Sequence, residues 1–465
     1  MSHGAAKGHE ANEANESRES IEQTAQTLEK LANYGLDAAK KLGADAAKIA
    51  TSASFQKRLV VENKVFSLAN SLSSRSIGLL VHKDQKKGSA SVNTVTEESI
   101  NHAAASALAL AKYSVPDEFL TLASLSEAPR AKPLPFLYTD ELAAVDLVEI
   151  QGFMQEVLGR LTSDARIALD RFEMAVDVSC HALASSTGMR QAERQAMASW
   201  SFMGMGRDGE EVTGFDYDSG FALTKSAILP GCLRDSTSFV AKLLALFKPR
   251  QCPTYKGAIL LTPRAVHELL VDSLLYHAGG RQVMDGKSRW AQSVGQRVVS
   301  GELTLRDHPH DPRFSGATGF DSDGLPTKQQ TLVEHGVLQM ILHDCYSAKR
   351  CKGKSTATSG GPFALEVAAG TTSKAELLRS HKQLLVVDRF SGNADPIKGD
   401  FSGVAKGSRL YSNGEDVGSV TETMIAGNFF TIAEEVLGVS RETELVSGGF
   451  LSPYILVGGV SVTGS

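Results

Sequence analysis

The residue pair most suggestive of metal chemistry is His267-Glu268. A zinc-peptidase helix of the HExxH type holds two histidines four residues apart on one face, and its glutamate activates a water molecule. Here the position four residues after His267 is Val271, and the next histidine, His277, lies on a different face of a regular helix. Asp272 is also poorly placed to complete such a site. The spacing therefore predicts an ordinary pair on a surface helix.

A second group of potential metal ligands lies in the segment Asp307-His308-Pro309-His310-Asp311. Pro309 favours an extended turn, in which His308 and His310 could point the same way. The sequence identifies no further ligand, and segments of this composition usually form turns. We expect a turn here. Metal binding by the two histidines is the alternative, and it would allow the chain to act as an autonomous hydrolase.

A cysteine nucleophile is the third chemistry to consider, because Cys345 and Cys351 lie near His343. Such a nucleophile needs a lowered thiol pKa and an oriented base. The sequence indicates neither of these, and a free cysteine usually behaves as a small hydrophobic residue. We therefore expect buried or inert cysteines.

Glycine pairs mark two further segments, Ser359-Gly360-Gly361-Pro362 and Gly448-Gly449. Neither segment matches a phosphate-binding loop of the GxxxxGK[ST] or GxGxxG type after a strand. We expect turns and close backbone contacts at both places.

A basic loop follows the cysteines and contains Lys349, Arg350, Lys352 and Lys354. Charge runs of this kind usually face water. The alternative is that these four side chains contact a peptide or a partner protein. The other basic cluster, over residues 83–87, is interpreted as a solvated loop.

The composition is that of an ordinary globular protein, with 42% hydrophobic and 22% charged residues among 465. The net charge of −5 argues against a nucleic-acid-binding surface. The five cysteines form no CxxC pair, which favours a reducing compartment. The sequence has no apolar run of membrane-spanning length and no signal-peptide core at its N-terminus, so we expect a cytoplasmic protein without membrane contacts.

The pattern of elements predicts an α+β fold, with a helix-flanked antiparallel sheet in the N-terminal region and a larger, β-rich C-terminal domain. Thr96 is an expected N-cap for an Ala-rich helix through residues 103–111. The proline-rich stretch from Val115 to Pro135 is an expected linker. The expected organisation is a disordered tail over 1–19, an α/β region over 20–130, a second over 131–250, and the β-rich domain over 251–465.

Several motifs of the chain occur in an order that resembles the TldD/PmbA family, also called TldD/TldE. In the N-terminal region these are Gly78-Leu79-Leu80-Val81 and Thr96-Glu97-Glu98. In the C-terminal half they are Asp323-Gly324-Leu325-Pro326-Thr327, Glu334-His335-Gly336-Val337-Leu338, Asp344 to Arg350, Gly399-Asp400-Phe401-Ser402-Gly403, Asn413-Gly414-Glu415 and Ile425-Ala426-Gly427-Asn428. Each motif is weak alone, and the shared order over residues 45–465 carries the resemblance.

The resemblance implies a cytoplasmic two-subunit zinc peptidase that trims unfolded peptides. The TldD-type subunit of the family holds zinc on an HExxxH helix, with a C-terminal cysteine as third ligand. In this sequence the matching helix follows the strand Ile259–Leu261 and starts at Pro263, which places Val271, Asp272 and Tyr276 at the His, Glu and His positions. His277 lies one residue beyond the last of these.

No cysteine follows Cys351, so the third family ligand is missing as well. A catalytic zinc needs about three protein ligands. The resemblance therefore implies a TldE/PmbA-type subunit with no catalytic residues and no metal of its own, whose TldD-type partner carries the zinc. The alternative is a stand-alone regulatory binding protein of the DNA-gyrase-modulator type.

Overall fold

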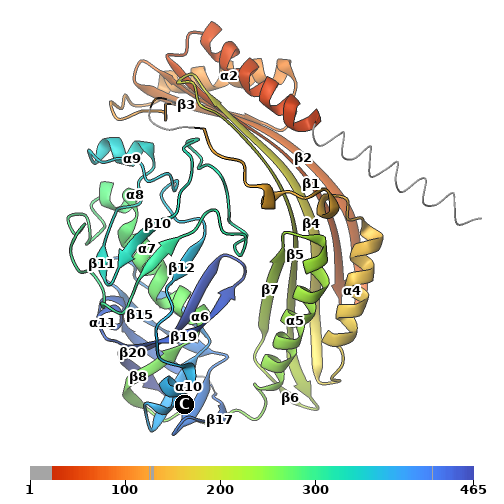
Figure 1. The fold of residues 1–465 in the computed structure, drawn as a ribbon, viewed down its shortest axis with the longest axis vertical. Helices are drawn as coiled ribbons and strands as arrows, with labels where there is room; N and C mark the ends of the chain where they lie inside the picture. Colours follow the sequence, from red (N-terminus) through yellow and green to blue (C-terminus); the bar gives the residue numbers. More distant parts are fainter. Residues whose placement is uncertain (1–22, 125, 127–129, 422, 465) are drawn as a thin grey trace, which may run out of the picture.

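The structure is a computed structural model that describes residues 23–124, 126, 130–421 and 423–464. It confirms the predicted mixed architecture, with an antiparallel N-terminal sheet and a larger C-terminal sheet (Figure 1). The tail expected over residues 1–19 lies outside the described residues. Among the residues that are described, no helix is long and apolar enough to cross a membrane.

The N-terminal sheet is built from unusually long strands. Its order is β3-β2-β1-β4-β5-β6, with β7 paired to β5, and all of its pairings are antiparallel. Strands from both sides of the expected boundary at 130/131 form this one sheet, because β1 pairs with β4 along its length. The strands are β1 (Ala46–Glu62), β2 (Val65–Lys83), β3 (Lys86–Val92), β4 (Ile167–Ser185), β5 (Arg190–Asp208), β6 (Glu211–Val212) and β7 (Asp216–Ala222).

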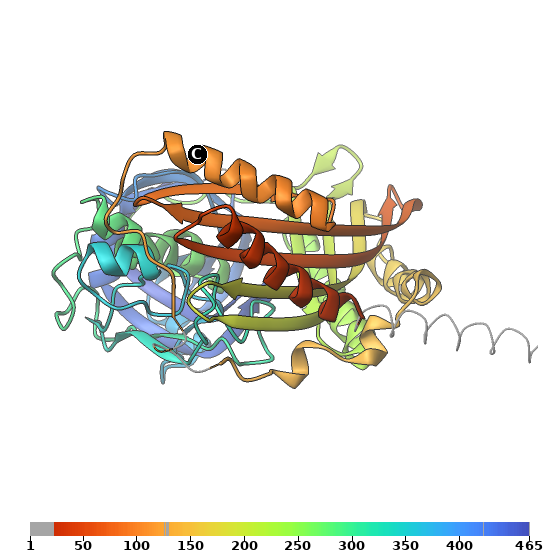
Figure 2. The ribbon, with the colours of Figure 1, turned by 90° about the horizontal axis from the view of Figure 1, so that it is seen from above.

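Helices cover the outer face of this sheet (Figures 1 and 2). They are a helix over 23–41, α2 (Glu97–Tyr113), α4 (Leu147–Leu161) and α5 (Lys225–Leu244). Thr96 is the predicted N-cap of α2 and forms a capping box with Ser99. The sheet curves around the C-terminal domain on its other side (Figure 1).

The C-terminal sheet has an apolar centre. Its strands run in the order β11-β10-β9-β12-β20-β8-β13-β16-β17, and β14, β15, β18 and β19 branch from this path. Strand β8 is buried from Ala258 to Leu261 and lies between β20 and β13. The strands are β8 (Tyr255–Leu261), β9 (Leu305–Asp307), β10 (Gln330–Glu334), β11 (Val337–Leu338), β12 (Leu365–Val367), β13 (Gln383–Val387), β14 (Arg389–Ala394), β15 (Asp400–Lys406), β16 (Arg409–Ser412), β17 (Glu415–Ser419), β18 (Met424–Asn428), β19 (Val436–Val446) and β20 (Phe450–Thr463).

A buried cluster of charged residues joins the two sheets. Asp216 on β7 lies 3.4 Å from Arg264 and 3.2 Å from Arg389, and Arg264 lies 3.6 Å from Asp388. The two guanidinium groups also lie over the Tyr217 ring, at 4.8 and 5.0 Å from its centre. This cluster fixes the start of the helix that follows β8 relative to the N-terminal sheet.

Candidate functional site

The helix that follows β8 contains a π-helical turn. It runs through α6 (Pro263–Val266), the π-turn η2 (His267–Val271) and α7 (Asp272–Ala278). Thr262 caps its start, and the Asp272 N–H donates to the His267 carbonyl five residues earlier. A π-turn inside an α-helix brings residues five apart onto one face and is frequent at functional sites.

This turn brings His267 and Asp272 together, although a regular helix would separate them. His267 Nδ1 lies 3.5 Å from Asp272 Oδ1, and both side chains are exposed, at 42% and 59%. The His267 ring packs edge-on against Phe450 at 5.1 Å. The Glu268 side chain is not part of this pair, because its Oε2 accepts the Phe390 N–H of β14 at 2.5 Å. Burial raises the pKa of the Glu268 carboxyl.

The positions matched to the family's zinc ligands differ in their surroundings. Val271 is 2% exposed and belongs to the apolar core of the C-terminal domain. Tyr276 is half-buried, and Asp272 is exposed. His277 is fully buried among aromatic rings, and its Nδ1 accepts the Arg289 N–H at 3.3 Å. Burial lowers the pKa of His277, so this imidazole is a neutral core group.

Zinc does not fit this helix. Val271 and Tyr276, which stand where the sequence resemblance predicts the two histidines, offer no imidazole nitrogen, and Glu268 is bound to β14. Across the described part of the chain, no group of three His, Cys, Asp or Glu side chains could hold a metal ion. The helix therefore lacks a suitable donor set for zinc.

The His308 and His310 side chains diverge. His308 Nε2 lies 3.0 Å from Glu366, whereas His310 Nε2 is hydrogen bonded to Thr327 at 2.9 Å. Asp307, which is fully buried, accepts N–H groups from residues 363 and 364. These contacts tie the segment to neighbouring loops, and they do not bring the two histidines to one centre.

Cys345 is not paired with His343. The Cys345 N–H donates to Asp323 Oδ2 at 3.0 Å, and His343 Nδ1 is instead bonded to Ser347 Oγ at 3.1 Å. Burial raises the pKa of the Cys345 thiol, and the nearby Asp323 charge raises it further. A thiol in this environment stays protonated and is a poor nucleophile.

The glycine-pair segments form turns, as the sequence predicted. Gly360 and Gly448 have positive φ values of 89° and 73°. The Gly448 carbonyl accepts the Ser315 N–H at 2.8 Å. A side chain at Gly448 would collide with the Phe221 ring of β7, so this turn is a contact between the two sheets.

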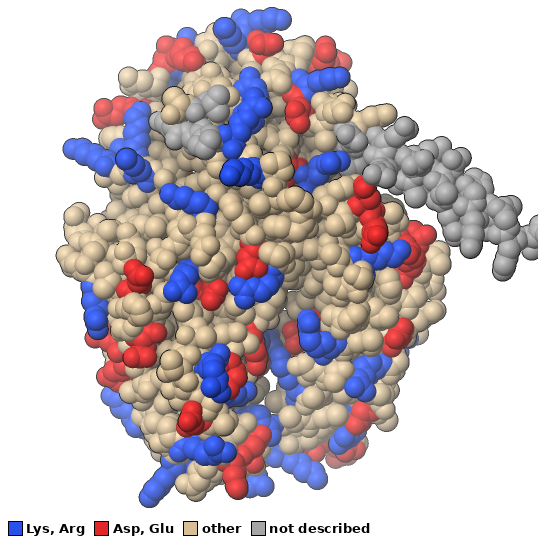
Figure 3. Space-filling model, viewed as in Figure 1, with Lys and Arg blue, Asp and Glu red and all other residues tan. Residues whose placement is uncertain are grey.

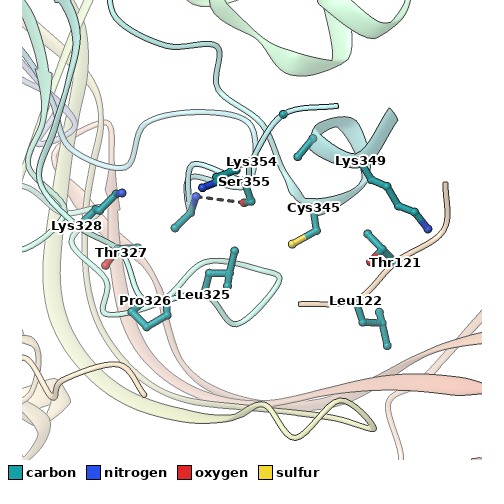
Figure 4. A pocket seen from close by; sticks show the side chains of 13 residues that line it. Thr121, Leu122, Leu325, Pro326, Thr327, Lys328, Cys345, Lys349, Lys354 and Ser355 are labelled. Atoms are coloured by element: carbon teal, nitrogen blue, oxygen red, sulfur yellow. Dashed lines mark hydrogen bonds between the residues drawn. The ribbon is translucent and has the colours of Figure 1, made fainter. Parts of the chain in front are cut away.

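A cavity of about 880 Å³ lies beside α9 (Cys345–Arg350). Figure 4 shows Lys328 and Lys354 on one side of it, Lys349 on the other, and Leu325 and Pro326 along its floor. The lining comes from the linker, the loop before β10, α9 and the loop after α9, through Thr121, Leu122, Leu325, Pro326, Thr327, Lys328, Cys345, Ala348, Lys349, Gly353, Lys354, Ser355 and Ala357.

The four basic residues identified in the sequence make different contacts. Lys349 Nζ donates to the Leu120 carbonyl at 2.9 Å, and the Arg350 guanidinium lies 5.8 Å from the Phe119 ring centre. Both therefore hold the linker against α9. Lys354 lines the cavity, and Lys352 is exposed outside the lining. Sequence reasoning missed Lys328, because its only signal was a position directly after the Asp323–Thr327 motif.

Comparison with known proteins identifies the family. A PmbA/TldA metallopeptidase C-terminal-domain model matches residues 254–464, and a PmbA/TldA metallopeptidase domain 1 model matches residues 51–111. The fold and sequence thus define a member of the metallopeptidase-like class to which these domains belong. The chain belongs to the PmbA/TldD family, as its motif order predicted.

Relatives and solved structures agree with this assignment. The chain is 26% identical over 411 residues to the metalloprotease PmbA of Escherichia coli O157:H7, covering 86% of this chain and 88% of the relative. It is 26% identical over 431 residues to a PmbA homologue of Haemophilus influenzae, with coverages of 90% and 92%.

Two solved structures share the fold. TldE from Thermococcus kodakarensis superposes with a TM-score of 0.79 at 22% identity, over 94% of this chain and 100% of that one. A Bacteroides thetaiotaomicron protein described as a candidate modulator of DNA gyrase superposes with a TM-score of 0.85 at 22% identity, over 94% and 98%.

Proposed function

We propose that this chain is the metal-free, non-catalytic subunit of a TldD/TldE-type zinc peptidase that acts on unfolded peptides in the cytoplasm. The observation that carries the proposal is the helix Pro263–Ala278, which has Val271 and Tyr276 at the positions where the family resemblance places the histidine ligands. The role of the chain is to shape the peptide cleft and to stabilise a TldD-type catalytic partner, which holds the zinc.

The open edge of β2 is a surface that suits such a partner. Strand β3 pairs with β2 only from Ile77 onward, and residues 65–75 of β2 are largely exposed. Leu68 and Leu72 are 40% and 59% exposed on this edge. An exposed edge with several apolar side chains, a single charge at Arg75 and no lysine or proline invites pairing with another strand. The partner, being of related fold, offers a strand of similar length.

Peptide capture uses strand pairing, because every unfolded peptide offers backbone groups whatever its side chains. Among the described residues, β14 pairs with β15 alone and lies against the helix with the π-turn. The Phe390 N–H points away from β15, toward Glu268, and alternate residues along a strand share this direction. The exposed residues 391–394 continue this free edge.

The proposal is tested by co-expressing the chain with a TldD-type subunit from the same genome. We expect the two proteins to co-purify, with about one zinc per complex and almost none in this chain alone after dialysis. Leu72→Lys on the β2 edge should weaken the association at least about tenfold. Leu110→Lys, at a 54% exposed site on α2, is the matched control and should not. A stable monomer that neither binds the partner nor alters its peptidase activity would overturn the proposal.

Stand-alone regulation of DNA gyrase is the second candidate function. It is supported by the description of two solved structures, from Bacteroides thetaiotaomicron and Thermotoga maritima, as candidate modulators of DNA gyrase. At 22% and 19% identity these structures carry the fold alone. Recovery of gyrase without any peptidase subunit in the same purification would favour this function over the first.

A further inference from the structure

The cavity beside α9 concentrates positive charge. Lys328, Lys349 and Lys354 line it, and its described lining contains no aspartate or glutamate. Lys and Arg side chains gather over α9 on the surface of this face (Figure 3). The field extends to His82 on β2, whose pKa is lowered by burial and then by Lys87, Lys48 and Lys349. This concentration is notable in a chain of net charge −5.

Three carboxylates that bond to the walls of the cavity are already engaged. Asp323 pairs with Lys48 at 2.9 Å and accepts the Cys345 N–H. Asp321 accepts the N–H groups of Asp323 and Leu325, both at 2.9 Å. Asp117, on the linker side, accepts the Tyr346 hydroxyl at 2.6 Å. These acids hold the walls together and leave the lysines of the lining without a carboxylate partner among the described residues.

The floor of the cavity is apolar. Leu122, Leu325 and Pro326 form it, and Ala357 adds to it from the loop after α9. A volume of about 880 Å³ holds several residues of a peptide and exceeds what a small inorganic anion needs. The combination of ammonium donors above and aliphatic carbon below suits a ligand with a carboxylate next to an apolar side chain.

We infer that this cavity binds the carboxylate of an apolar peptide segment, with Lys328 and Lys354 contacting the carboxylate and the Leu325–Pro326 floor taking the adjacent aliphatic side chain. The carboxylate comes from the C-terminus of the peptide or from an internal acidic residue, because both present the same group. The inference deepens the proposed function and rests on it for the source of the peptide. It gives the non-catalytic subunit its own contact with the substrate.

The test is direct binding to the full chain alone, measured by fluorescence anisotropy. The probe is Gly-Ser-Gly-Ala-Leu-Leu with an uncharged N-terminal dye and a free C-terminal carboxylate. The same peptide as a C-terminal amide is the second probe, and an amidated peptide with an internal Glu-Leu pair is the third. We expect the free acid to bind at least about tenfold more tightly than the first amide, with affinity falling as salt is raised. The third probe distinguishes a chain end from an acidic side chain as the source.

Variants locate the binding. Lys328→Gln with Lys354→Gln should weaken binding of the acid at least about tenfold and leave binding of the amide unchanged. Lys352→Gln is the matched control for Lys354→Gln alone, because each removes one charge from the loop after α9 and Lys352 lies outside the lining; it should change affinity less than about twofold. Thermal melts check that all variants fold.

Three outcomes would overturn the inference: equal affinity for all three probes, no detectable binding of either probe that carries a carboxylate, or a loss in Lys352→Gln equal to that in Lys354→Gln. An equal loss in Lys352→Gln would mean that the lysines act only through general surface charge. Binding is measured without a partner, so failure here leaves the co-purification result standing. Failure of co-purification, in turn, leaves a measured peptide site intact.

Discussion

The helix Pro263–Ala278 and the cavity beside α9 lie in the same domain, yet they use charged side chains in opposite ways. Around the helix, Arg264 is paired with Asp216 and Asp388, and Glu268 accepts a β14 N–H. Around the cavity, Lys328 and Lys354 have no carboxylate partner among the described residues. Charges that are paired hold the fold, and charges that lack a partner are available to a ligand.

The helix and the cavity also differ in whether the sequence identifies them as a site. The helix is the element that the family resemblance predicts as the metal site of the catalytic subunits, and the predicted histidine positions hold Val271 and Tyr276 in this chain. The cavity matched no catalytic motif in the sequence, and its chemistry depends on residues from four separate segments.

Asp216→Ala tests the paired charges near the helix Pro263–Ala278 and has the largest expected effect. Asp216 is 2% exposed, and its removal leaves Arg264 and Arg389 with a surplus of buried positive charge. We expect unfolding by urea to show a loss of about 3–5 kcal/mol. Asp285→Ala, which breaks an exposed pair with Arg281, is the control and should cost less than about 0.5 kcal/mol. A small effect at Asp216 would mean that these charges do not hold the junction.

Asp321→Asn tests how the buried Asp321 carboxyl in the cavity wall makes stability depend on pH. Burial raises the pKa of Asp321 to about 6, and the Asp323 charge adds to this. The folded state therefore holds the proton more tightly than the unfolded state. The stability from the protonated carboxyl is fully present below about pH 4 and is lost as the pH rises through about 6.

The measurement compares the free energy of unfolding of Asp321→Asn and the unaltered chain between these pH values. As the pH rises, the variant should gain about 2–3 kcal/mol in free energy of unfolding relative to the unaltered chain. Asp164→Asn is the control, because the Arg166 side chain lowers the pKa of Asp164 to about 2 and that carboxyl does not titrate in this window. A pH-independent difference at Asp321 would show that its carboxylate is stabilised as well in the fold as in water.

Val271→Ala tests whether the first ligand position belongs to the core. Val271 is 2% exposed in the central apolar cluster, so its truncation should leave a cavity and cost about 2 kcal/mol in urea unfolding. Val148→Ala, at a 74% exposed position on α4, removes the same atoms from a helix surface and should change stability by less than about 0.5 kcal/mol. Equal effects would mean that Val271 faces a cleft, and the ligand register would need revision.

Local sequence signals predicted part of this fold well. The Thr96 N-cap, the helix through residues 103–111 and the strand 257–261 all follow from short-range chemistry. The full length of the long strands was not predicted, since β1 extends back to Ala46 through a stretch of alanines and small polar residues in which Ile49 and Phe55 are the large apolar side chains. Its pairing is decided by β2 and β4 on either side, and no local pattern reports such contacts.

The helix α5 shows the same limit. The sequence pattern predicts a helix only over residues 235–247. The structure starts α5 at Lys225 and keeps Pro230 within it, since Ile228, Cys232 and Phe239 bury one face against the sheet. The cavity was equally hidden, because its lysines are brought together only by tertiary contacts such as Lys349 with the Leu120 carbonyl.

Asp272→Ala has the smallest expected effect and bears most directly on the metal question. The His267–Asp272 pair is exposed on both sides, so its loss should cost less than about 0.5 kcal/mol of stability. Added zinc should raise the melting temperature of neither the unaltered chain nor the variant, because Glu268 is bound to β14 and the pair lacks a third donor among the described residues. If zinc stabilises the unaltered chain and Asp272→Ala abolishes that gain, the π-turn holds a metal after all and the helix, like the cavity, is a ligand site.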